Sequence, residues 1–302
     1  MKRIFGILTL ALSVVLISCE KEPNISIDQD LSEKAAEIVQ DEIAVSNAES
    51  EVSYEANFYI NAERAIVGMA KIGKRWNWKN ILRYRIGQCP DVTINSTETG
   101  YPKTITLDYG DGVELNNGRI LSGLITIVIS APHKTDGATK TVTYNNFSVD
   151  SISVSGTSEF LFVGNNETSR MHIHTGDLYF TMPDGKIIYR EVNKTHEWLF
   201  GVDTPEDMTD DVIQITGSVE VSVSTGNEYF KEITTPIIKK GDCRWFVEGV
   251  VEISVNGETK IVIDYGNGDC DASATVTKDG ATNEIDLSGK NPRVRNGNNG
   301  NG

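Results

Sequence analysis

The sequence predicts an all-β protein: an antiparallel meander, folded as a sandwich or as one curved sheet, preceded by a short helical segment. Apolar and polar residues alternate through much of residues 89–287, as in Val219-Glu220-Val221-Ser222-Val223. This period of two is typical of strands with one buried face. Turn signals such as Asn117-Gly118 and Asn256-Gly257 separate the runs. No stretch after residue 64 shows the 3.6-residue period of an amphipathic helix.

The N-terminus predicts export and attachment to a membrane. Residues 1–18 combine a cationic start with an apolar run that is too short to span a bilayer, which is typical of a signal peptide. The segment ends in Leu16-Ile17-Ser18-Cys19, which resembles the lipobox of bacterial lipoproteins. The resemblance implies cleavage before Cys19 and acylation of that residue, with palmitate among the chains that hold the protein on the membrane.

The residues that follow Cys19 indicate a location. Glu20 stands where an Asp would retain a lipoprotein in the inner membrane, and Cys19-Glu20-Lys21-Glu22 is similar to the export signal of Bacteroidetes surface lipoproteins. We therefore expect a lipid-anchored protein of the outer membrane, displayed on the cell surface, with the periplasmic leaflet as the alternative. Both locations are oxidising and permit disulfides.

Charge is distributed unevenly along this chain, whose net charge is −15. Residues 19–63 contain 12 acidic and 2 basic side chains, and Asp30 followed by Glu33 is typical of a helix start. We expect an acidic tether there, with one weakly amphipathic helix. Residues 64–88 contain seven basic side chains and no acidic one.

The basic and aromatic side chains of residues 64–88 form a candidate site for an anionic ligand. A glycan, a lipopolysaccharide phosphate or a lipid headgroup would suit them, because cations attract anions and indole rings stack on sugars. The alternative, which we favour, is that this block packs against the acidic tether and the charges cancel. The candidate residues are Lys74, Arg75, Trp76, Trp78, Lys79, Arg83 and Arg85.

Two segments of the β region echo each other. Ile-Thr-Leu-Asp-Tyr-Gly-Asp-Gly at 105–112 follows Cys89, and Ile-Val-Ile-Asp-Tyr-Gly-Asn-Gly at 261–268 follows Cys243. The repetition predicts two related halves, about 64–155 and 156–287, within one β-rich domain at 64–287. The Gly- and Asn-rich tail, 288–302, should be disordered.

In the second half, one turn predicts which residues of two neighbouring strands lie opposite each other. A two-residue turn at Asn256-Gly257 places Val255 opposite Glu258, and the same register places Cys243 opposite Cys270. We therefore predict a Cys243–Cys270 disulfide, which closes about 26 residues and contributes on the order of 3 kcal/mol. The register makes them a hydrogen-bonded pair, which suits a disulfide less well, so a bulge or ladder end is expected near 266–268.

Eight segments occur in order along the chain: 104–112, 117–119, 122–127, 144–149, 154–157, 210–217, 243–245 and 263–271. Together they resemble a family of uncharacterised Bacteroidetes lipoproteins, over roughly residues 85–287. The resemblance implies a surface or periplasmic lipoprotein and brings no activity with it. It departs at Val113-Glu114, where the family tends to have a cysteine. Cys89 is then a buried thiol, which we favour, or it pairs elsewhere.

Three further clusters have a functional and a structural interpretation, and we favour the structural one each time. Asp-Tyr-Gly-Asp-Gly at 108–112 is similar to the core of PKD domains, but glycine-rich turns carrying Asp need no cation. His172 and His174 share a strand face that suits a transition metal, with Asp177 or His196 as a third ligand, yet a solvated pair is the default. The acidic loop 203–211 lacks the pattern of a calcium-binding EF-hand.

Catalytic motifs are absent: the sequence has no Gly-x-Ser-x-Gly, His-Glu-x-x-His or Gly-x-x-x-x-Gly-Lys pattern. We expect a non-enzymatic envelope lipoprotein without metal or cofactor, held on the membrane by acylated Cys19. It would be a binding or adhesion module for a glycan, lipopolysaccharide or another anionic component. The alternatives are a periplasmic carrier that holds a lipid in a concave sheet, and a glycan-acting hydrolase with paired carboxylates. The location excludes nucleic acid as a partner.

Overall fold

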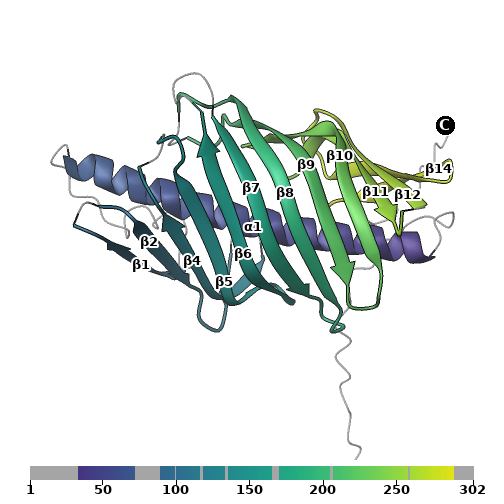
Figure 1. The fold of residues 1–302 in the computed structure, drawn as a ribbon, viewed down its shortest axis with the longest axis horizontal. Coiled ribbons are helices and arrows are strands. Elements are labelled where there is room, and N and C mark those ends of the chain that lie inside the picture. The colour runs from purple at the N-terminus through teal and green to yellow at the C-terminus, as the bar shows by residue number, and fades with distance from the viewer. Residues whose placement is uncertain are drawn as a thin grey trace, which may run out of the picture.

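The computed structural model describes residues 33–71, 89–98, 100–115, 118–132, 135–164, 170–204, 207–257 and 259–288, with the helix side chains from Lys34 to Ala62. It shows one long helix and one antiparallel sheet (Figure 1). The signal peptide, the anchor Cys19, the cationic candidates from Lys74 to Arg85 and almost all of the tail lie outside these residues. Those expectations stay predictions.

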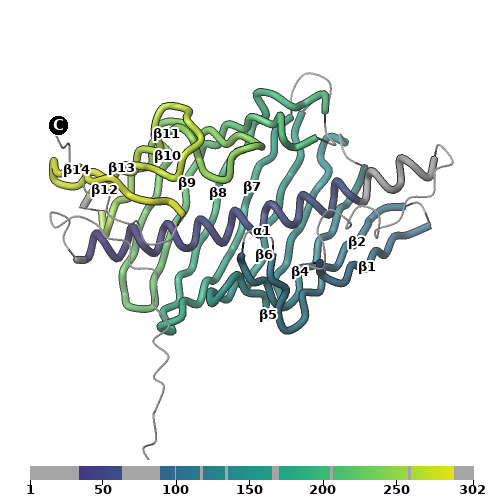
Figure 2. The backbone as a smooth tube through the Cα atoms, turned by 180° about the vertical axis from the view of Figure 1, so that it is seen from behind, coloured from purple at the N-terminus to yellow at the C-terminus, as the bar shows by residue number. Residues whose placement is uncertain are grey.

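The sheet is a meander in which nearly every strand pairs with its neighbours in the sequence. The order is β1-β2-β4-β5-β6-β7-β8-β9-β10-β11-β12-β13-β14, and β3 pairs with β4 beside this path. The sheet is open, with β1 and β14 at its edges, and it curves around the helix (Figures 1 and 2). This confirms the all-β meander and selects one curved sheet over a sandwich. The strands are β1 (Asp91–Ser96), β2 (Lys103–Asp108), β3 (Val113–Glu114), β4 (Ile120–Ile129), β5 (Thr139–Val149), β6 (Ile152–Val163), β7 (Met171–Thr181), β8 (Ile187–Phe200), β9 (Val212–Val223), β10 (Glu228–Lys240), β11 (Phe246–Val255), β12 (Thr259–Asn267), β13 (Ser273–Lys278) and β14 (Ala281–Asp286).

Helix α1 (Glu33–Lys71) crosses the concave face of the sheet, running over the strands (Figure 2). Apolar side chains recur every three or four residues along it, which places them on one side of the helix. The expected helix is therefore present, but it is a central element of the core rather than part of a tether. It also continues to Lys71, past the expected boundary at residue 63. Its buried apolar side chains are Ala35, Ile38, Val39, Ile43, Val45, Ala48, Val52, Ala56, Tyr59, Ile60 and Ala62.

Two apolar clusters lie along the helix. Ile38 and Ile43, near its N-terminal end, pack with residues of β9 to β14. Val52 and Tyr59, farther along, pack with residues of β2 to β9. One helix thus joins both ends of the sheet, and the expected division at residue 155 falls inside β6. The two related halves therefore belong to one continuous sheet.

Glycines allow the sheet to curve where neighbouring backbones approach each other. At Gly156 (φ 109°) and Gly217 (φ 115°), an added Cβ would lie 2.0 and 2.2 Å from a carbonyl oxygen of the adjacent strand. No other residue fits such an approach, and glycines of this kind mark tight bends within strands. Register shifts between β5 and β6 and between β9 and β10 add local bends.

The two echoed segments form the same local hydrogen bond, one at the end of β2 and the other within β12. At 108–110 and at 264–266, the Asp side chain accepts a 2.9 Å hydrogen bond from the glycine N–H two residues on. These are Asx turns, the interpretation that we favoured from the sequence. The central tyrosine of each segment is buried, and the Tyr109 hydroxyl donates a 2.6 Å hydrogen bond to Glu55 on α1.

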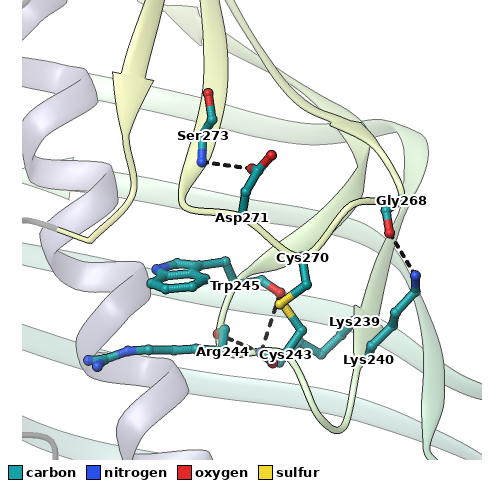
Figure 3. The surroundings of a disulfide bond; sticks show 9 residues. All are labelled: Lys239, Lys240, Cys243, Arg244, Trp245, Gly268, Cys270, Asp271 and Ser273. Carbon is teal, nitrogen blue, oxygen red and sulfur yellow. Dashed lines mark hydrogen bonds between the residues drawn. A yellow bond between two sulfur atoms is a disulfide. The ribbon is translucent and has the colours of Figure 1, made fainter. Parts of the chain in front are cut away.

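The expected Cys243–Cys270 disulfide is present, with its Cα atoms 5.7 Å apart (Figure 3). The register that led to it is wrong by one residue, because Val255 pairs with Thr259 and three residues connect β11 to β12. A bulge at 248–250 interrupts the pairing of β11 with β12, whose last pair is Glu248 with Asn267. Both cysteines lie beyond that pair, so the regular spacing of paired strand residues does not set the distance between them. Cys89, expected to be buried, is only partly buried.

Candidate functional site

Cations that directly precede β8 and β4 neutralise acidic side chains of α1. Lys186 Nζ lies 3.0 Å from a Glu37 carboxylate oxygen and 2.8 Å from one of Asp41. Farther along the helix, Arg119 Nε lies 3.7 Å from Glu51. Cations next to the strands therefore supply counter-charges to α1, and the expected packing of residues 64–88 against the acidic segment stays a prediction, because those side chains lie outside the described part of the chain.

A buried charge network lies between α1 and the middle of the sheet. Arg190 of β8, which is 1% exposed, has guanidinium nitrogens 3.3 Å from both Glu42 and Glu49. Lys231 of β10 pairs with Glu42, and Lys194 Nζ lies 3.8 Å from Glu49. Burial alone would raise the pKa of Glu42, but the charges of Arg190 and Lys231 outweigh it and lower that pKa to about 2. Three cations thus share two carboxylates.

A cavity of about 730 Å³ lies beside this network, between α1 and the inner faces of β6 to β11. The sheet supplies most of its apolar wall, and α1 adds polar groups such as Asn47, Ser50 and Asn57. The volume is within the range of roughly 300–1,000 Å³ that is typical of small-ligand pockets. The apolar side chains from the sheet are Phe160, Ile213, Ile215, Ile233, Ile237 and Phe246.

His174, Lys194 and His196 form what we call the polar corner of the cavity. His174 of β7 pairs in register with Lys194 of β8, and His196 lies two residues farther on, so the three side chains leave the same face of the sheet. The two imidazole centroids are 5.6 Å apart, and His174 stacks on Phe160 at 4.1 Å. On its other side Lys194 pairs in register with Gly217, whose backbone approaches that of Asn193 and Lys194 closely.

The polar corner lacks hydrogen-bond partners for buried atoms. Within the described residues, both ring nitrogens of His174 and Nε2 of His196 are buried and have none. Burial, reinforced by the charge of Lys194, lowers the pKa of His196 to about 3, and burial also lowers the pKa of His174 well below its ordinary value. Burial lowers the pKa of Lys194 to about 8, which the charge of Glu49 only partly opposes. At neutral pH the imidazoles are therefore neutral and the ammonium is charged.

The histidines are not the solvated pair expected from the sequence. His172 packs against Trp198, with ring centroids 4.7 Å apart, and Asp177 lies on the opposite face, where it accepts a hydrogen bond from Tyr189. In the described part of the chain, no three His, Cys, Asp or Glu side chains are placed to hold a metal ion. Carboxylates of the acidic loop bond locally, as Asp207 does by accepting two hydrogen bonds from Thr209.

From the sequence, His174 and His196 stood out only as possible metal ligands, and the buried cations Arg190, Lys194 and Lys231 did not stand out at all. The pattern of β8 contains a signal that could have revealed them. Arg190, Lys194 and His196 occupy the same face of the strand as the buried residues Ile188 and Val192. A cation at a core position indicates a buried partner. Which carboxylate meets it depends on how α1 crosses the sheet, and local pattern does not specify that crossing.

The chain matches no family model, no curated protein and no solved structure. Among the described residues, no helix combines the length and the apolar character that crossing a membrane requires.

Proposed function

We propose that this protein is a non-enzymatic lipoprotein of the outer membrane, anchored through acylated Cys19, whose folded body binds a small, largely apolar ligand. The cavity of about 730 Å³ between α1 and the sheet carries the binding role. Curved sheets commonly hold small ligands on their concave side, in apolar cavities with a few polar groups. The lipobox and the residues after it support the anchor and the location.

The surroundings of the cavity support a binding site rather than a defect of packing. Protein interiors are close-packed and leave few voids larger than a water molecule. The ion pairs of Arg190 and Lys231 with Glu42 hold α1 against the sheet beside the cavity. A cavity with walls held in this way is preformed, so binding requires little rearrangement.

The glycan-binding role has its own support on the outer face of the sheet. Tyr179 is 46% exposed, and its ring centroid lies 4.9 Å from that of Tyr189, which is hydrogen-bonded to Asp177. Aromatic rings beside a carboxylate suit a sugar, which stacks on the rings and donates hydroxyl hydrogen bonds. Glycan-array binding that is lost in Tyr179→Ala would support this second candidate, and absence of any glycan signal for the wild type would contradict it.

The cavity is tested with residues 20–302, exported through a soluble-protein signal so that the disulfide can form. The probe is N-phenyl-1-naphthylamine, an uncharged apolar dye whose fluorescence rises in apolar surroundings. Ile233 lies on the cavity wall, so Ile233→Trp places an indole in the binding space. Ile187→Trp is the matched control, because Ile187 is 42% exposed and does not line the cavity.

We expect saturable dye binding at one site per chain, at least about tenfold weaker in Ile233→Trp and unchanged in Ile187→Trp. Circular dichroism confirms that both variants fold. Absence of saturable binding, or equal binding by Ile233→Trp, would show that the cavity is not a binding site.

The anchor is tested separately, in cells. Radiolabelled palmitate should label the wild-type chain and leave Cys19→Ala unlabelled, since the thiol that receives the lipid is then absent. Protease added to intact cells should digest a surface-displayed protein. Protection from that protease would place the protein on the periplasmic leaflet instead.

A further inference from the structure

We propose that the cavity binds a single-chain amphiphile with one carboxylate head, and that the head lies at the polar corner while the chain follows the apolar wall of the sheet. This inference rests on the proposed function, because it assigns a ligand class to the same cavity. Three observations carry it: an uncompensated charge, a set of buried polar atoms without partners, and the direction of the apolar wall.

The buried network is short of one negative charge. Among the described residues, Arg190, Lys194 and Lys231 form ion pairs with two carboxylates, Glu42 and Glu49. Lys194 is the least satisfied of the three, because its Nζ is 3.8 Å from Glu49, beyond hydrogen-bond distance, and Glu49 also faces Arg190. A buried cation without a full counter-charge is unfavourable. One anionic group in the cavity completes the network.

Other cations of the cavity wall already have partners. Lys239 donates hydrogen bonds to the backbone carbonyls of Cys243 and Arg244, as Figure 3 shows for the loop that carries the disulfide. The Arg244 guanidinium lies 3.8 Å from Glu51. The unmet charge is therefore at the polar corner rather than at the loop.

The polar corner also has hydrogen bonds to offer. A neutral imidazole carries one N–H donor, and an ammonium carries three. His174 uses neither ring nitrogen, and His196 does not use Nε2, within the described residues. The two oxygens of a carboxylate accept from Lys194 and from an imidazole N–H, which gives a charge-assisted bond and satisfies an orphaned buried group at once.

The apolar wall begins beside the polar corner. Ile215 of β9 pairs in register with His196, and Ile237 of β10 pairs with Ile215, so apolar side chains continue from the corner across the inner face of the sheet. Ile233 lines the same cavity. A ligand that suits both regions is charged at one end and apolar along its length.

The test measures displacement of N-phenyl-1-naphthylamine at neutral pH by three molecules with one chain length: dodecanoate, dodecanol and dodecyltrimethylammonium. In the wild type we expect dodecanoate to bind at least about tenfold more tightly than dodecanol, with the cation weakest, because a hydrogen bond to a charged group is worth about one to two decades of affinity. Dodecyl phosphate, which is close to doubly charged, should bind less well than dodecanoate.

Lys194→Met should abolish the preference for dodecanoate over dodecanol, which is measured as the ratio of the two affinities within the same variant. It should fold, because Glu49 keeps Arg190 as its partner; Lys194→Gln is a second variant of similar length. The control is Lys260→Met, which removes an exposed lysine paired with Glu252 and should keep the wild-type preference.

The outcomes separate the two proposals. Equal binding of dodecanol and dodecanoate by the wild type, tighter binding of dodecyl phosphate, or an intact preference in Lys194→Met would overturn the carboxylate head while cavity binding stands. No saturable binding of the dye would overturn the proposed function itself. The comparison of heads in the wild type needs no variant, so it holds even if a substitution at Lys194 prevents folding.

Discussion

Replacing Glu42 by glutamine should lower the free energy of unfolding by about 3–5 kcal/mol, the cost of breaking a buried ion pair by removing one partner. Glu42 is 9% exposed, lies 3.3 Å from Arg190, pairs with Lys231 and accepts a 2.7 Å hydrogen bond from Ser46. Glutamine keeps the shape but removes the charge, so Lys231 loses its carboxylate partner and Arg190 keeps Glu49 alone. The pKa of Glu42, lowered from 4.5 to about 2, corresponds to about 3 kcal/mol and agrees in size.

The assay is urea unfolding followed by circular dichroism at neutral pH, with Glu37→Gln as the control. Glu37 pairs with Lys186, but its side chain is 52% exposed, so that loss should stay below about 1 kcal/mol. The double variant Glu42→Met with Lys231→Met should recover part of the loss, since no unpaired charge of that ion pair is left. Equal effects of Glu42→Gln and Glu37→Gln would refute the role of the buried network in holding α1.

Three further predictions concern the rest of the fold. Replacing Cys243 and Cys270 together by alanine should lower the free energy of unfolding by about 3 kcal/mol in urea titrations, and stability equal to the oxidised wild type would refute a stabilising disulfide. Gly217→Ala should lower the free energy of unfolding by more than about 2 kcal/mol, because the added Cβ would lie 2.2 Å from a carbonyl oxygen. Gly226→Ala, at φ 92° in open space, should lower it by about 1 kcal/mol. Similar losses in the two variants would contradict the close approach at Gly217. His196 stays neutral in the folded protein, where its pKa is about 3, but it takes up a proton below about pH 6.5 in the unfolded chain. Its contribution to the free energy of unfolding is therefore fully present above that pH, and the free energy of unfolding falls by about 2 kcal/mol at about pH 5. Urea titrations at both pH values should show this slope reduced in His196→Gln, and an unchanged slope would be evidence against it.

The sequence predicted the strands well because the cause of each is local. Alternation at 219–223 places valines on one face whatever the rest of the chain does, and β9 contains that run. The turn at Asn256-Gly257 was also recognised, but its length was not, since Asn and Gly tolerate positive φ in loops of two or three residues. That difference moved the register by one residue while leaving the disulfide in place.

The helix shows why the remainder could not be predicted. Glu42, Glu51 and Glu55 are buried, which interrupts the apolar stripe of α1 with carboxylates and makes it look weakly amphipathic. A carboxylate is expected in solvent unless a partner is known. The partners, Arg190 and Tyr109 among them, are provided by strands far along the chain.

By itself, the sequence determined the class of the fold, the positions of several turns and the cysteines that pair, because each depends on residues adjacent in the chain or on one strand register. The tertiary structure alone decided that α1 is part of the core, that Glu42 meets Lys231 across 189 residues, and that the cavity has a polar corner. The physical reason is the curvature of the sheet. It brings inward-facing positions of distant strands around one helix, where burial turns ordinary charged residues into obligatory partners.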